Sequence, residues 1–157
     1  MKRQLYVIFL FVLLMFSGVT VFAGEAEDAE WFEMTEGEGD SVIQPEIANP
    51  YNLYLGSVYT AISYPGDYDI KLRAEVYCSD TVATIQTNFY LQKKYNGVWT
   101  TVSQGTATKT DSHYMYKNMY VYNVTAGTYR CMTNTKVTSY SGYAETMDSY
   151  SPSVTIS

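Results

Sequence analysis

The stretch Leu72-Arg73-Ala74-Glu75-Val76-Tyr77-Cys78 alternates between apolar and polar side chains, and it is the clearest indication of the fold. Successive side chains of a β-strand point to opposite faces of the sheet, so this alternation predicts a strand with one buried face. The next alternating stretch, residues 85–91, is expected to bury Phe89 and Leu91. Both stretches are typical of antiparallel sheets, in which one face meets the core and the other meets solvent.

The rest of the chain from about Tyr51 onward continues in the same style. It is rich in Tyr, Thr, Val and Ser and has no apolar period of 3.6 residues. Asn96-Gly97 is a strong hairpin signal, because both residues tolerate the positive φ of a type I′ turn. We therefore predict an all-β fold, a single antiparallel β-sandwich of about seven strands over residues 46–157. The expected strands are 52–63, 69–78, 82–94, 98–107, 113–124, 128–138 and 143–156.

The N-terminus has the features of a secretory signal peptide. Lys2 and Arg3 precede an apolar run from Leu5 to Phe16, and Ala23 ends a stretch with small residues at the cleavage positions. The run is shorter than the roughly 20 residues of a comfortable membrane span, although an uncleaved anchor is the alternative. We predict cleavage after Ala23, which removes residues 1–23 and leaves a secreted protein with no segment in the membrane.

An acidic leader is predicted to follow the signal peptide. Residues 24–40 contain eight acidic residues and no basic one, whereas the chain from Ser41 onward has eight of each sign. A run of like charge repels itself, so residues 24–45 are expected to be disordered. We interpret Trp31, Phe32 and Met34 within it as residual apolar character, and a short docking segment is the alternative.

Two patterns near the C-terminus resemble known sandwich domains. Gly127-Thr128-Tyr129-Arg130-Cys131 resembles the start of strand F in immunoglobulin-like domains, where a tyrosine two residues before a cysteine folds its hydroxyl back onto the preceding corner. Residues 124–129 are also similar to the corner of fibronectin-like sandwiches. With the signal peptide and acidic leader, the whole chain resembles small exported domains of Gram-positive bacteria. This resemblance implies a fold and an extracellular or cell-surface location, but no activity.

The immunoglobulin resemblance also implies a disulfide bond between Cys78 and Cys131, the two cysteines of the chain. Cys78 would take the place of the strand B cysteine. Closing this loop would stabilise the fold on the order of 4 kcal/mol in the chain-entropy model. An exported chain favours oxidation, and the alternative is a pair of buried reduced thiols.

Catalytic and cofactor sites are not expected. The one histidine, His113, lies in Asp111-Ser112-His113, but adjacent residues point in different directions whereas a catalytic triad must converge. Asp67, Asp69 and Glu145 are interpreted as solvated turn acids rather than Ca²⁺ ligands. Nucleic-acid binding is set aside because the folded part lacks a basic cluster. We predict no enzyme, no metal site and no cofactor.

One pattern points to a binding surface. Tyrosines occupy alternate positions in residues 114–122, so a strand would place Tyr114, Tyr116, Tyr120 and Tyr122 on its outer face. Tyrosine combines a flat apolar ring with a hydroxyl group and is enriched in recognition surfaces. It also has high β-propensity, so an ordinary solvated sheet face is the alternative interpretation.

The sequence therefore supports a secreted, non-catalytic binding module. The first hypothesis is a module that binds a glycan or a protein through the four tyrosines. The second is a structural or assembly protein that pairs with a partner chain by edge-strand addition. An enzyme is the third and least supported hypothesis, because no arrangement of residues favours it.

Overall fold

The alternation that predicts the fold is confirmed, because the side chains of Leu72, Ala74 and Val76 are fully buried. The computed structural model describes residues 30–37, 53–67 and 69–157, so the predicted signal peptide lies outside the described residues. The regular secondary structure of the described part consists of β-strands, all paired antiparallel. They are β1 (Met34–Gly37), β2 (Leu55–Gly66), β3 (Asp69–Tyr95), β4 (Val98–Val121), β5 (Gly127–Thr138), β6 (Ala144–Tyr150) and β7 (Val154–Ile156).

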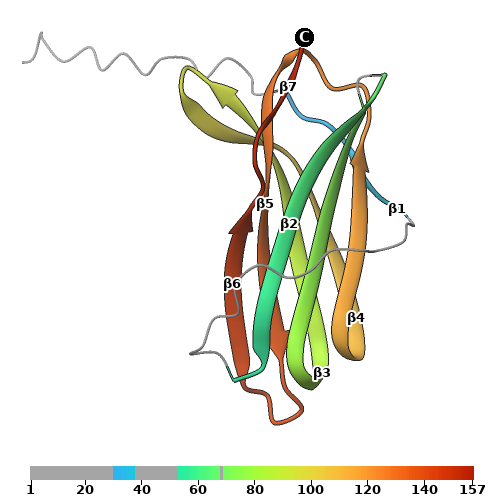
Figure 1. Ribbon diagram of the computed structural model, residues 1–157, viewed down its shortest axis with the longest axis vertical. Helices are drawn as coiled ribbons and strands as arrows, with labels where there is room; N and C mark the ends of the chain where they lie inside the picture. The colour runs from blue at the N-terminus through green and yellow to red at the C-terminus, as the bar shows by residue number, and fades with distance from the viewer. Residues whose placement is uncertain (1–29, 38–52, 68) are drawn as a thin grey trace, which may run out of the picture.

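Two of these strands run through both layers of the fold. β3 has 27 residues and β4 has 24, whereas a typical strand has about 5 or 6. Their shared ladder is interrupted between Tyr77 and Val82, and in β4 Asp111 adopts a φ of 52° near this gap. Both strands turn back there, at the lower end of the molecule in Figure 1. Positions equally far from the turn consequently face each other, as Leu72 and Phe89 do in one core cluster.

The turn divides each long strand into halves that lie in different layers. In one layer, β2, the N-terminal half of β3 (69–77), the C-terminal half of β4 (114–121) and β1 follow one another. The other layer holds the N-terminal half of β4 (98–112), the C-terminal half of β3 (82–95), β5 and β6, and β7 also pairs with β5. The fold is thus an immunoglobulin-like antiparallel β-sandwich, as predicted.

The segment boundaries differ from those predicted in three places. Segments 69–78 and 82–94, expected to be separate strands, are the halves of β3, and 98–107 and 113–124 fall in β4. The segment 143–156 is divided into β6 and β7 by residues 151–153, where Pro152 has no N–H to donate to a ladder. Asn96-Gly97 forms the predicted hairpin between β3 and β4, with φ values of 48° and 87°.

The space between the layers holds two apolar clusters. The one nearer the turn of β3 and β4 contains Val76, Ile85 and Met115. The other contains Leu72, Phe89, Met119, Tyr129 and residues around them. Burial of this apolar surface from both layers is the main stabilising contribution to the sandwich.

The corner before β5 has the geometry that the immunoglobulin resemblance implied. The Tyr129 side chain is fully buried, and its hydroxyl donates a hydrogen bond of 2.7 Å to the backbone carbonyl of Thr125. The hydroxyl therefore fastens β5 to the loop that precedes it.

The predicted disulfide bond is wrong, because Cys78 and Cys131 are both free thiols in different parts of the core. Cys78 lies at the turn of β3 and packs with the cluster near it, whereas Cys131 pairs with Leu91 in the other cluster. The strand from Val82 to Leu91 alone spans roughly 30 Å. A disulfide needs Cα atoms within about 7 Å, so the fold keeps these thiols apart.

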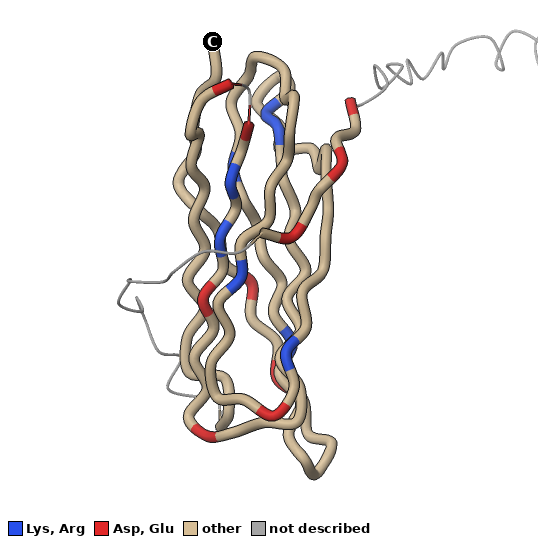
Figure 2. The backbone as a smooth tube through the Cα atoms, turned by 90° about the vertical axis from the view of Figure 1, so that its right-hand side faces the viewer, with Lys and Arg blue, Asp and Glu red and all other residues tan. Residues whose placement is uncertain are grey.

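The predicted disorder of the acidic leader, residues 24–45, does not hold for residues 30–37. Met34–Gly37 form β1, an edge strand paired with Val121–Asn118 of β4. Phe32 is buried in the core and Met34 packs against it, so these two apolar residues of the leader dock against their own domain, whereas Trp31 is exposed. Figure 2 shows this acidic segment along the side of the sandwich, while Lys and Arg are spread over its length.

Candidate functional site

The predicted tyrosine row lies on the outer face of the layer that contains β1 and β2. Tyr114, Tyr116 and Tyr120 belong to the C-terminal half of β4 and are half-buried, and Tyr122 follows the strand and is 48% exposed. The alternate residues Met115, Met119 and Val121 are buried in the core. This confirms the face assignment that the sequence pattern predicted.

Neighbouring strands extend this surface beyond the four predicted residues. The register of β3 on β4 places Tyr77 opposite Tyr114 and Lys71 opposite Tyr120, and β2 adds Tyr59 beside Glu75. Sequence alternation indicated that Tyr77 points outward, but only the register shows that Tyr77, Lys71 and Tyr59 join the row. We call the combined surface the tyrosine face: Tyr59, Lys71, Arg73, Glu75, Tyr77, Tyr114, Tyr116, Asn118, Tyr120 and Tyr122.

A carboxylate lies at the lower end of the tyrosine face. The Glu75 side chain is fully buried, and the hydroxyls of Tyr77 and Tyr114 donate to its Oε2 atom at 3.2 and 3.4 Å. Arg73 Nε lies 3.8 Å from the other carboxylate oxygen. Burial, together with the hydrogen bonds to Tyr114 and Glu75, raises the pKa of Tyr77 to about 12. The Tyr77 hydroxyl therefore stays protonated, as a donor, across the physiological pH range.

The upper end of the tyrosine face is built from stacked rings. The rings of Tyr120 and Tyr122 lie 6.2 Å apart at an interplanar angle of 10°. The Lys71 ammonium lies 5.8 Å from the centre of the Tyr120 ring. Gly37 of β1 makes room for this ring, because any Cβ atom there would collide with the edge of Tyr120. Flat rings, hydroxyls and cations together suit a ligand with both apolar faces and polar edges.

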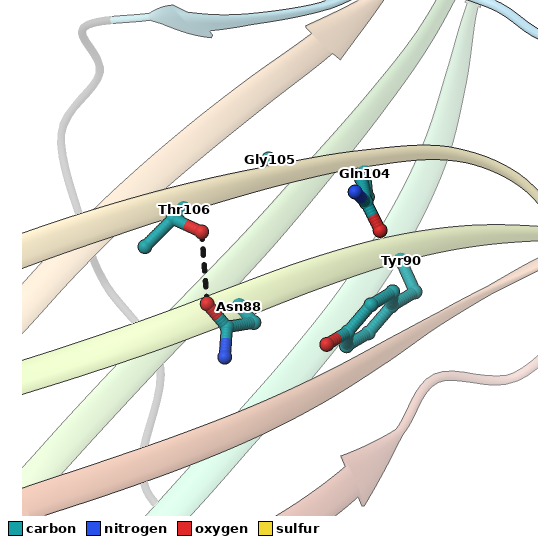
Figure 3. A pocket seen from close by; sticks show the side chains of 5 residues that line it. All are labelled: Asn88, Tyr90, Gln104, Gly105 and Thr106. Atoms are coloured by element: carbon teal, nitrogen blue, oxygen red, sulfur yellow. Dashed lines mark hydrogen bonds between the residues drawn. The ribbon is translucent and has the colours of Figure 1, made fainter.

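A shallow pocket lies on the opposite outer face, and the sequence analysis missed it. It is lined by Asn88 and Tyr90 of β3 and by Gln104, Gly105 and Thr106 of β4, and its volume is about 330 Å³ (Figure 3). Thr106 Oγ1 donates a 2.8 Å hydrogen bond to Asn88 Oδ1. The lining is neutral, so it offers a tyrosine ring, amides and a hydroxyl rather than charge.

The residue types that suggested chemistry do not converge. His113 is exposed, and Asp111 accepts a hydrogen bond from the Tyr140 hydroxyl. Among the described residues, no three His, Cys, Asp or Glu side chains gather as a metal site would require. Glu145, predicted to be a solvated turn acid, is instead buried and accepts hydrogen bonds from three backbone N–H groups. Nor does the described part include a helix long and apolar enough to span a membrane.

Comparison with known proteins gives a distant structural likeness. No protein-family model and no curated protein matches the chain. Among solved structures, the chain is similar to ACE19, the collagen-binding subdomain of the Enterococcus faecalis surface protein ACE. The TM-score is 0.38 and the identity 8%, over 69% of this chain and 99% of the other. A likeness at this level carries no argument about a ligand.

Proposed function

We propose that this chain is a secreted, non-catalytic binding module that recognises an extended glycan through the tyrosine face, at the cell surface or in the surrounding medium. The observation that carries the proposal is the aromatic surface itself. Stacked rings at one end and hydroxyls held by Glu75 at the other lie along one strand direction. The export features of residues 1–23 support the location.

The chemistry of the face suits a sugar chain. A pyranose ring presents an apolar face of C–H groups, which stacks on tyrosine, and hydroxyl edges, which take hydrogen bonds from side chains. Glu75 balances the Arg73 charge within the face and leaves the Lys71 ammonium beside the Tyr120 ring, where it can donate to a sugar hydroxyl. Tyr114, Tyr116 and Tyr120 follow one another along β4, which favours a linear ligand over a compact one.

Binding to insoluble cell-wall glycans tests this proposal. Residues 24–157 would be compared with a variant in which Tyr114, Tyr116, Tyr120 and Tyr122 are all changed to Ala. A matched control carries Asn88→Ala and Tyr90→Ala in the pocket on the opposite face. The melting temperature of each variant checks that it is folded.

We expect the native protein and the pocket variant to sediment with the glycan and the tyrosine variant to remain in solution. Loss of binding in the pocket variant alone would move the site to the opposite face. Absence of binding by the native protein would overturn glycan recognition.

Assembly by strand addition is the second candidate function, and one observation favours it. The C-terminal half of β4 has an edge that already accepts an added strand, since β1 pairs with it from the leader. An edge that pairs with a short segment of its own chain can pair in the same way with a strand from elsewhere.

A further inference from the structure

Residues 30–37, which we call the N-terminal segment, cross the side of the sandwich between its two layers. The Phe32 N–H donates a 2.7 Å hydrogen bond to the Val102 carbonyl, in the N-terminal half of β4. Met34–Gly37 then pair with residues 118–121, in its C-terminal half. Because β4 turns back on itself, these two contacts lie in different layers. The segment thus bridges the two edges that β4 presents.

Two side chains of the segment enter the core. Phe32 is 8% exposed, whereas its neighbour Trp31 is 58% exposed and points to solvent. Met34 occupies a space left by Gly105 in β4. A Cβ atom at Gly105 would come within 2.8 Å of the Met34 sulfur. The absence of a side chain at position 105 therefore creates the space that Met34 fills.

Acidic residues near both ends of the segment meet cations of the sandwich. Glu30 accepts a 2.6 Å hydrogen bond from the Thr125 hydroxyl and lies 3.4 Å from the Lys93 ammonium. Glu36 forms an ion pair with Lys117. Burial would lower the pKa of Lys93, but Tyr129, Tyr95 and Glu30 outweigh this effect and raise it, so the cation persists. The segment is therefore held in place both by its charges and by the fit of its buried side chains.

We call the receiving surface the β4 slot and define it by Lys93, Val102, Gly105, Lys117 and Met119. Each of its residues belongs to β3 or β4. In the sequence, these strands follow residues 38–52, whereas the N-terminal segment precedes them. The contacts are therefore the same whether the segment comes from the same molecule or from another. This is the condition under which a terminal strand can be exchanged between identical chains.

We infer that the β4 slot binds the N-terminal segment of a second copy of this chain, so that two molecules exchange β1. The inference rests on the second candidate function, strand addition, and names the partner. Because the segment and the slot belong to one chain, binding within a molecule does not depend on the protein concentration, so a dilute molecule closes on itself. At high protein concentration, or where docking within one molecule is blocked, the segment docks on a second copy instead.

A pair of complementary variants of residues 24–157 tests the inference. Phe32→Asp with Met34→Asp makes a chain whose segment cannot dock but whose slot is intact. Gly105→Leu fills the space of Met34 and makes a chain whose slot is blocked but whose segment is intact. Each variant alone is expected to be monomeric, and an equal mixture is expected to contain a heterodimer by size-exclusion chromatography with light scattering. A mixture of Gly105→Leu with the unchanged protein is the control, expected to stay monomeric at concentrations at which the unchanged protein alone is monomeric.

A mixture that remains monomeric would overturn the inference. A synthetic peptide of residues 28–39 added to the Phe32→Asp, Met34→Asp chain separates two kinds of failure. Peptide binding without a heterodimer would refute exchange between copies and leave strand addition standing, whereas absence of both would refute strand addition too. The glycan test uses the unchanged protein and other variants, so its outcome is read independently of this one.

A cross-linking measurement covers the case in which a variant does not fold. Met34→Cys with Gly105→Cys, in a background of Cys78→Ser and Cys131→Ala, places two thiols across the slot. After refolding and oxidation over a range of protein concentrations, we expect the share of disulfide-linked dimers to rise with concentration. Cross-links confined to single chains at every concentration would contradict exchange.

Discussion

At the scale of single residues, Glu145 shows how a buried charge holds two distant segments together. Its carboxylate accepts hydrogen bonds from the backbone N–H groups of Leu53, Tyr54 and Leu55 at 2.6, 3.0 and 2.7 Å. Burial alone would raise the pKa of this carboxyl. The three donors lower the pKa by more than burial raises it, so the net pKa is below the ordinary value of 4.5. The carboxylate of β6 thus anchors the start of β2.

Replacing Glu145 by Gln should destabilise the protein by about 2 kcal/mol, because a neutral amide accepts fewer and weaker hydrogen bonds. The contribution of Glu145 depends on pH, since its folded pKa is below its unfolded pKa. It is present in full above the unfolded value near 4.5 and is lost as pH falls through the folded value. Urea unfolding at pH 7 and at several acidic pH values measures both effects. A stability gap that does not narrow in acid would contradict this role.

At the scale of elements, the N-terminal segment shows why the local sequence pattern could not predict which part of the leader is ordered. Its composition predicted disorder, because eight acids in residues 24–40 repel one another. In the fold, Lys93 and Lys117 offset two of these charges, and Phe32 and Met34 are buried. Phe32 and Met34 are two residues apart, which is the spacing of one strand face. This spacing was the sequence feature that indicated a docked strand.

Phe32→Ala should lower the free energy of unfolding by roughly 2 to 4 kcal/mol, because it removes a buried ring from the edge of the core. Trp31→Ala is the matched control. Its side chain is mostly exposed, so a change below about 0.5 kcal/mol is expected. Denaturant unfolding followed by circular dichroism measures both. Equal effects of the two substitutions would mean that the segment does not dock through Phe32.

At the scale of the whole molecule, the path of β3 decides the state of the cysteines. Cys78 precedes the turn between the layers, and Cys131 pairs with Leu91 well beyond it, so the thiols belong to separate clusters. Burial raises the pKa of both, that of Cys78 to about 11. Neither is a thiolate near neutral pH, and the thiolate is the reactive form.

The protein should therefore keep the mass of two reduced thiols, even after purification in air. Thiol labelling at pH 8 is expected to be slow in the folded protein and slowest at Cys131, which is fully buried. Labelling should become rapid for both thiols in denaturant. A mass lower by two hydrogens in freshly purified protein would show that the cysteines are joined after all.

The corner at Tyr129 was implied by the resemblance to immunoglobulin-like domains. Local sequence patterns alone predicted strands instead of helices, the inward faces of residues 72–76 and 115–121, and the Asn96-Gly97 hairpin. These depend on side-chain alternation and on backbone preferences, which act within a few residues. How the strands meet depends on the tertiary fold. It turned β3 and β4 back into two layers, separated Cys78 from Cys131, added Lys71 and Tyr77 to the tyrosine row, and ordered residues 30–37. Strand register and packing between layers depend on residues far apart in the chain, and no local pattern specifies them.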